Sequence, residues 1–146
     1  PELLRSVIFL LFTAGNLATA ILPMYANNMY KPLFNLPKEF VVTLPFTMDM
    51  TFSALALIII PNILQRVGLK RLGITAAIFS VIGNIICFIA RDTTYLAFAY
   101  ALTGFSGGTM LLVINTIIGG QKDIEDVNKG FAHFNASYLA GISILY

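Results

Sequence analysis

The sequence predicts an all-α protein, a polytopic bundle of transmembrane helices, from three observations. The 146-residue chain is 58% hydrophobic and 11% charged, with a mean hydropathy of +0.83, whereas soluble domains contain about 25% charged residues. Apolar stretches of roughly 20 residues, the length that crosses a bilayer, recur along the chain. These stretches lack the period-two alternation of membrane β-barrels, so helices are the expected spanning elements.

The first expected span covers residues 5–24 and carries Asn16 near its middle. This amide has two interpretations: a hydrogen bond to a substrate, or an interhelical bond that contributes about 1 kcal/mol or less. A signal peptide is an alternative interpretation of the segment, with Arg5 as the charged end and residues 18–20 as a cleavage site. We expect a span because the apolar run continues past that site and further spans follow.

The second expected span covers residues 40–64 and contains Asp49. A carboxylate at membrane depth is costly unless it faces protein or water, so Asp49 is a candidate functional group. The functional interpretation is a carrier of a proton or another cation, or a partner for a cationic substrate. The alternative is a hydrated carboxylate near the outer interface. Asp49 lies ~14 Å into a span that begins at Phe40, but only ~6 Å into one that begins at Pro45.

The third and fourth expected spans cover residues 72–90 and 95–120. We interpret the small residues of the third span as a packing stripe. In the fourth span, Gly104 and Gly108 form a small-xxx-small pair, which favours close helix packing. Asn115 follows in the same span and has the same two interpretations as the amide of the first span, namely a bond to substrate or to a neighbouring helix.

The fifth expected span covers residues 131–146 and is truncated. It follows a connection of mixed charge at 121–130, which we interpret as solvated. We interpret His133 as an interfacial residue at the start of the span. Because the chain begins at Pro1 and ends inside an apolar run, we expect it to be a fragment of a longer protein, with the C-terminal half missing.

Basic residues are distributed unevenly between the two sides of the predicted bundle. The N-terminus and the second and fourth connections hold six: Arg5, Arg66, Lys70, Arg71, Lys122 and Lys129. The first and third connections hold three: Lys31, Lys38 and Arg91. By the positive-inside rule, this asymmetry predicts a multi-pass protein of the cell membrane with a cytoplasmic N-terminus. The stretch IIIPNILQRVGLKRLGI is then two apolar helices joined by a basic cytoplasmic turn.

This basic turn resembles a motif of the major facilitator superfamily that lies between the second and third helices. The motif consists of Gly, three residues, Asp, Arg, any residue, Gly and two basic residues. The matching residues are Arg66, Gly68 and Lys70, followed by Arg71. The departures are Pro61, Gln65 and Leu69, at the first Gly, the Asp and the first basic position. The resemblance covers the whole chain, as helices one to five of the family's N-terminal six-helix half.

The resemblance implies a secondary transporter that moves a small molecule across the membrane by alternating access. It makes three residues candidates for substrate binding or ion coupling: Asp49, Asn16 and Asn115. It also implies a conformational-switch loop, made of Gln65, Arg66, Gly68, Lys70 and Arg71. The motif's acidic residue belongs to a charge network that locks one conformation, so the uncharged Gln65 implies a weaker or different lock. Tyr100 stands where many proton-driven members have an Arg, which argues against that drug-efflux subtype.

Other function classes find little support in the residues. The net charge of +2 is too small to indicate nucleic-acid binding, no Cys and His run has metal-ligand spacing, and no ATP-binding loop or other cofactor motif is present. We expect no enzyme activity, because no nucleophile, base and orienting group can be assembled. The expected partners are the lipid bilayer, a small-molecule substrate and protons or another cation. The alternative function is a transporter-like domain that senses or anchors a partner without transport. A membrane-embedded enzyme is a third interpretation, which would need a cluster of His, Asp or Ser at one interface.

Overall fold

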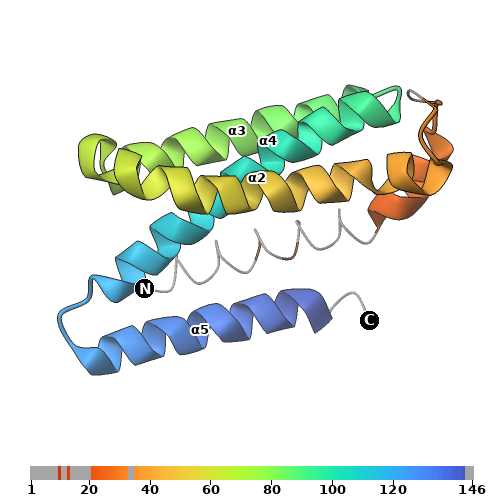
Figure 1. The fold of residues 1–146 in the computed structure, drawn as a ribbon. Helices are drawn as coiled ribbons and strands as arrows, with labels where there is room; N and C mark the ends of the chain where they lie inside the picture. Colours follow the sequence, from red (N-terminus) through yellow and green to blue (C-terminus); the bar gives the residue numbers. More distant parts are fainter. Residues whose placement is uncertain (1–9, 11–12, 14–20, 33–34, 144–146) are drawn as a thin grey trace. The chain divides into compact units, whose positions relative to one another are not determined.

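The structure, a computed structural model, describes residues 10, 13, 21–32 and 35–143. Within these residues the chain forms helices and no strand, as expected for an all-α protein. A helical segment at 21–28 precedes four longer helices, which are α2 (Lys38–Val67), α3 (Leu69–Ile89), α4 (Thr93–Gly119) and α5 (Ile124–Ser143) (Figure 1). Most of the first expected span, including Asn16, lies outside the described residues.

Three of the described helices are long and apolar enough to cross a membrane: α2, α3 and α4. Their bounds agree with the second, third and fourth expected spans to within three residues at each end. Large apolar side chains project from them, such as Ile58 of α2 and Phe88 of α3, which are 70% and 87% exposed. Such side chains are usually buried in soluble proteins. In these helices they form surfaces suited to contact with lipid.

α2 runs without interruption through both of its prolines. Pro45 lies in the third turn and is fully buried, so it does not begin the helix. Asp49 therefore lies eleven residues after the first residue, Lys38, or ~16 Å along the helix axis. The helix itself therefore begins before Pro45, and the depth of Asp49 in the membrane stays a prediction.

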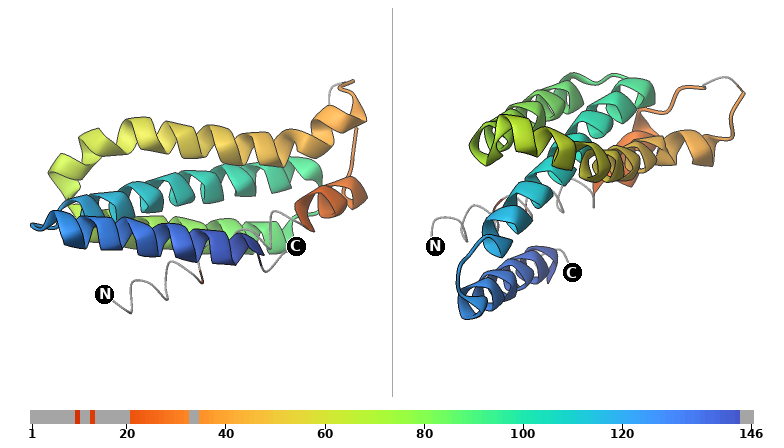
Figure 2. Two further views of the ribbon diagram at one scale, coloured as in Figure 1. Left: turned by 90° about the horizontal axis from the view of Figure 1, so that it is seen from below. Right: turned by 60° about the vertical axis from the view of Figure 1, so that its left-hand side comes forward.

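The contacts divide the chain into two compact units. One unit, residues 23–115, contains α2, α3 and most of α4, which run alongside one another (Figure 1 and Figure 2). α2 and α3 are antiparallel, because a single non-helical residue, Gly68, joins them. The second unit combines the beginning of the chain with residues 116–146, and it contains the end of α4 and α5.

Gly68 makes the hairpin between α2 and α3 possible. Its N–H donates to the carbonyl of Leu64 at 3.0 Å, and its carbonyl accepts from the N–H of Leu72 at 3.2 Å. Its dihedral angles, φ 83° and ψ 154°, lie in a region that is essentially restricted to glycine. The predicted basic turn is thus tighter than the sequence suggests, since its cations belong to the ends of the two helices.

α5 begins at Ile124, so the charged segment expected to be a solvated connection at 121–130 is mostly helical. Its charges suit a helix start: Glu125 and Asp126 lie in the first turn, where the helix dipole favours acidic residues. The ammonium of Lys129 lies 2.7 Å from the Glu125 carboxylate one turn earlier. α5 is not among the described helices that meet the length and composition of a span. The fifth span therefore stays a prediction.

Candidate functional site

Asp49 lies on the face of α2 that packs against α4. Ser53, Ala56 and Ile60 share this face at helical spacing. Ala56 and Ile60 are buried, and Asp49 is half-buried. In the structure this face forms a contact between two helices.

The contact is close because α4 presents glycines to α2. A methyl group at Gly104 would overlap the backbone carbonyl of Asp49. One at Gly108 would overlap the carbonyl oxygen of Ser53 and lie 3.0 Å from the Cβ of Ala56. Asp49 contacts Gly104, and four residues later in both helices Ser53 contacts Gly108. Residue numbers therefore increase in the same direction along the two helices, so α2 and α4 are parallel here. This is the close approach that small-xxx-small spacing permits in membrane helices.

Thr103 is the residue that meets the Asp49 carboxylate. Its hydroxyl lies 3.5 Å from Asp49 Oδ1 and 3.1 Å from the carbonyl oxygen of Tyr100. The shorter bond is the stronger one, because hydroxyl donors prefer oxygen atoms at 2.5–3.0 Å. The hydrogen bond to the carboxylate is therefore weak. No Lys or Arg in the described part of the chain forms an ion pair with Asp49.

Two further ionisable side chains lie within electrostatic range of Asp49. They are Cys87 of α3 and Tyr100 of α4, and both are half-buried. Together with Thr103 they form what we call the Asp49 cluster: Asp49, Cys87, Tyr100 and Thr103. Each of the three membrane-length helices contributes to it. The cluster places a carboxylate, a thiol and two hydroxyl groups on helices that are otherwise largely apolar, with Cys87 near the end of α3.

α3 reaches the cluster through a second close approach. A methyl group at Gly83 would lie 2.6 Å from Thr103 Cγ2 and 3.2 Å from the carbonyl oxygen of Ala99. Further along, the Ser106 hydroxyl donates to the carbonyl of Ala76 at 2.6 Å, and this bond is buried. From the first contact to the second, residue numbers rise along α4 and fall along α3. The helices α3 and α4 are therefore antiparallel. α4 is thus the shared partner of both neighbours.

The other predicted site residues lie away from the cluster. Asn115 is half-buried on α4, eleven residues after Gly104, which is ~16 Å along the axis. The structure therefore does not bring Asn115 next to Asp49. The switch residues Gln65, Arg66, Lys70 and Arg71 are exposed around Gly68. Among the described residues, none of these cations forms an ion pair.

A structural cluster that sequence reasoning missed lies at the start of α4. Asp92 accepts hydrogen bonds from the N–H groups of Thr94 and Tyr95 at 3.0 and 3.1 Å. Its carboxylate also lies 3.6 Å from the ammonium of Lys31. Aspartate just before a helix is a common N-cap, so the capping rule could have identified it. The Thr93 hydroxyl, which donates to the carbonyl of Met29 at 3.2 Å, joins the preceding segment to α4.

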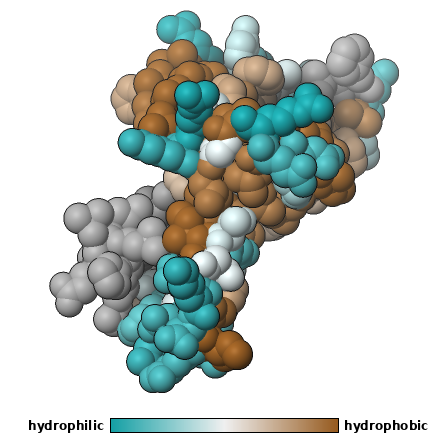
Figure 3. All heavy atoms as spheres, turned by 90° about the vertical axis from the view of Figure 1, so that its left-hand side faces the viewer, coloured by the Kyte–Doolittle hydropathy of each residue, from teal (hydrophilic) through white to brown (hydrophobic). Residues whose placement is uncertain are grey.

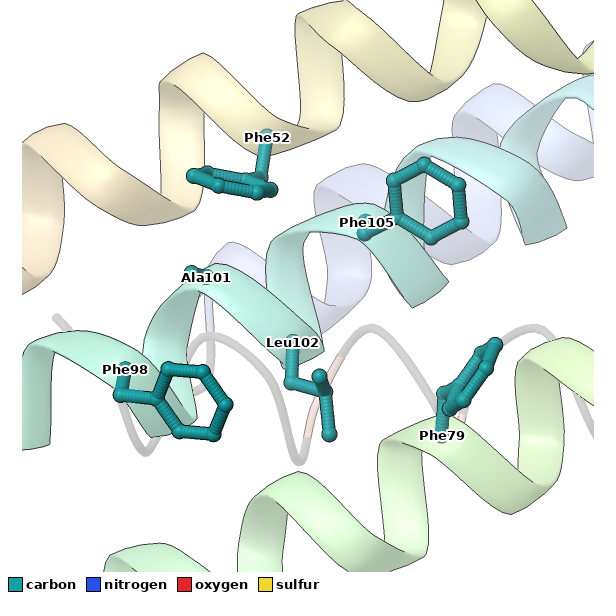
Figure 4. A pocket seen from close by; sticks show the side chains of 6 residues that line it. All are labelled: Phe52, Phe79, Phe98, Ala101, Leu102 and Phe105. Atoms are coloured by element: carbon teal, nitrogen blue, oxygen red, sulfur yellow. The ribbon is translucent and has the colours of Figure 1, made fainter. Parts of the chain in front are cut away.

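An apolar hollow of about 200 Å³ lies between the three helices. Figure 4 shows its lining, with Phe52 from α2, Phe79 from α3 and the remaining four side chains from α4. Those four are Phe98, Ala101, Leu102 and Phe105. The lining has no polar side chain, so the hollow suits an apolar group and not a charged one.

The described residues contain no group of three or more His, Cys, Asp or Glu side chains that could hold a metal ion. The chain matches no protein-family model, no curated protein and no solved structure. Its function therefore has to be inferred from the Asp49 cluster and from the apolar helices that carry it.

Proposed function

We propose that the protein is a secondary transporter that moves a small molecule across the membrane by alternating access. The observation that carries the proposal is the half-buried Asp49 carboxylate inside an apolar helix of membrane length. Ionisable residues within membrane spans are rare and typically mark ion or substrate pathways. The resemblance of the basic turn to the major facilitator superfamily motif supports the same function.

We assign the binding of a proton, another cation or a cationic substrate group to Asp49. Its hydrogen bond from Thr103 is long, and no described cation neutralises it. A half-buried carboxylate that lacks such compensation is stabilised by a bound proton or cation. Tyr100 and Cys87 carry O–H and S–H groups that can act as donors to an ionised carboxylate or to a substrate.

The helix contacts suit a moving part. Gly104 and Gly108 bring smooth backbone surfaces of α2 and α4 together without interlocking side chains. The single-residue connection at Gly68 lets the α2–α3 hairpin change its angle with few dihedral rotations. We place the Gly68 turn and the N-terminus in the cytoplasm of a multi-pass cell-membrane protein, from the distribution of Lys and Arg.

Transport by the full-length protein tests the proposal. The purified protein is reconstituted into vesicles, and uptake of a panel of labelled metabolites is measured with and without a pH gradient. We expect Asp49→Asn to abolish gradient-driven accumulation, because the amide has the same shape but binds neither a proton nor a cation. Asp92→Asn is the matched control, since it also removes one carboxylate while keeping the N-cap.

The expected result for the control is unchanged accumulation. If Asp49→Asn transports with the same pH dependence as the unaltered protein, Asp49 is not the ion carrier. If the unaltered protein moves no member of a broad panel, the transporter function itself loses its support.

A further inference from the structure

The outward face of α3 carries a shallow apolar hollow of about 330 Å³. Its lining consists of Ile74, Ala77, Ile78, Val81 and Ile82. These residues recur at spacings of three and four, so they form one stripe along the helix. All are exposed. The stripe begins with Ile74, the sixth residue of α3.

Two cations lie at the hairpin end of this stripe. Lys70 is four residues and Arg71 three residues before Ile74, so both project from the same side of α3 as the hollow. Both are exposed, and neither forms an ion pair within the described part of the chain. Arg66, in the last turn of α2, adds a third exposed cation across Gly68. Figure 3 faces this end and shows hydrophilic side chains gathered beside hydrophobic ones.

No contact among the described residues offsets these charges. Lys70 and Arg71 stand in the first turn of α3, where the positive end of the helix dipole disfavours cations. The first turn of α3 contains no acidic residue that would offset them. Three cations within six residues also repel one another. A negative group from outside the chain would relieve both effects.

The membrane supplies such a group at this level. α2 and α3 are both long and apolar enough to cross a bilayer, so the turn between them lies where the hydrocarbon layer meets the headgroups. Phosphate is the anion present there, and a guanidinium binds it in a bidentate manner while an ammonium acts as a point charge.

We propose that this face of α3 binds an anionic phospholipid, with the phosphate at Lys70 and Arg71 and one acyl chain in the hollow from Ile74 to Ile82. The headgroup charge supplies the preference, because an acyl chain gains little by moving from bulk lipid into an apolar hollow. The hollow fixes the position of the chain. The proposal rests on α2 and α3 spanning the membrane and is independent of transport.

Tryptophan fluorescence tests it, because the chain contains no Trp. Ile78→Trp places a single reporter in the hollow of the full-length protein. The protein is assembled into phosphatidylcholine nanodiscs that contain increasing fractions of a dibrominated quencher lipid. We expect brominated phosphatidylglycerol to reach half-quenching at a mole fraction roughly fivefold lower than brominated phosphatidylcholine. Phe105→Trp, in the hollow of Figure 4, is the control reporter and should show no headgroup preference.

Paired variants of the Ile78→Trp protein identify the cause. Lys70→Gln with Arg71→Gln should remove the preference, whereas Lys122→Gln with Lys129→Gln removes equal charge elsewhere and should retain it. Ala77→Phe fills the hollow with both cations in place and should reduce quenching by either lipid. Nanodiscs expose both membrane faces, so altered insertion does not affect the measurement.

Three results would overturn the proposal. They are equal quenching by the two lipids, a preference that persists in the Lys70→Gln and Arg71→Gln protein, and no quenching by either lipid, which would mean that protein covers the hollow. If the double variant does not fold, the Ile78→Trp protein with both cations is measured at high salt instead. Salt screens the cations, so the preference for phosphatidylglycerol should weaken.

Discussion

Gly68 has a conformation that other residues rarely adopt. Its φ of 83° with ψ of 154° costs a side-chain-bearing residue about 1–3 kcal/mol, while a methyl group there would meet no atom within 4 Å. We therefore expect Gly68→Ala to lower the free energy of unfolding by about that amount, through backbone strain alone. Unfolding of the purified protein in detergent, followed by helical circular dichroism, measures the change.

Gly107→Ala is the control for this prediction. Gly107 is helical and also has open space around a methyl group, so alanine should leave stability unchanged or raise it by up to about 1 kcal/mol. Equal stability of the Gly68→Ala and Gly107→Ala proteins would mean that the α2–α3 hairpin does not need glycine's conformational freedom.

Asp49 could be identified from the sequence, because a carboxylate inside an apolar run is anomalous by itself. Its neighbours could not. Thr103 of α4 contacts the Asp49 carboxylate only because α2 and α4 have particular rotations about their axes. The close approach at Gly104 sets one of these rotations, and no single-helix periodicity specifies which face of α4 turns toward α2.

At the scale of the helices, Gly104 controls the distance between α2 and α4. A methyl group at this position would overlap the Asp49 backbone, which cannot rotate away as a side chain can. We expect Gly104→Ala to lower the free energy of unfolding by about 1–3 kcal/mol, even though alanine gains about 1 kcal/mol in helix propensity. Thermal unfolding of the two alanine variants at positions 104 and 107 provides the comparison, and matching midpoints would rule out a tight α2–α4 contact.

The start of α4 depends on Asp92. Asp92→Ala removes a side chain that accepts two backbone hydrogen bonds, and we expect a loss of about 1 kcal/mol. Asp92→Asn keeps the capping oxygen and loses only the ion pair with Lys31. The Lys31 side chain is mostly exposed, so this ion pair is worth about 0–1 kcal/mol. The asparagine variant should therefore unfold nearer to the unaltered protein. An equal loss in both variants would show that the charge, and not the cap, stabilises the helix.

The sequence predicts best the helices whose length and hydropathy match those needed to cross a bilayer. The second to fourth spans follow from length and hydropathy, and α2, α3 and α4 match them closely. The sequence does not predict the start of α5, because the many charges from Asp123 to Lys129 favour a solvated connection. The favourable acidic first turn and the ion pair between Glu125 and Lys129 are local helix signals that outweigh that polarity.

Within the unit of residues 23–115, α4 has the central position. It packs in parallel with α2 and antiparallel to α3, and its serine and glycine contacts are buried on both sides. α2 and α3 turn most of their large apolar side chains outward instead. This division predicts that α4 tolerates polar substitutions on fewer faces than its neighbours, since it has the least surface left for lipid or water.

The orientation that we propose for the whole molecule rests on the balance of Lys and Arg between its two sides. Thr94→Lys adds a cation to the connection at Arg91, and Gln65→Lys adds one beside the Gly68 turn, and both positions are exposed. The positive-inside rule predicts that Thr94→Lys lowers the fraction of correctly inserted protein, whereas Gln65→Lys leaves that fraction unchanged or raises it. Reporters of sidedness fused within the two connections measure each fraction in cells. Equal effects of the two substitutions would show that these charges do not set the orientation, and a greater loss with Gln65→Lys would place the Gly68 turn outside the cytoplasm. The phosphate contact at Lys70 would then face the outer leaflet, where anionic lipid is scarcer.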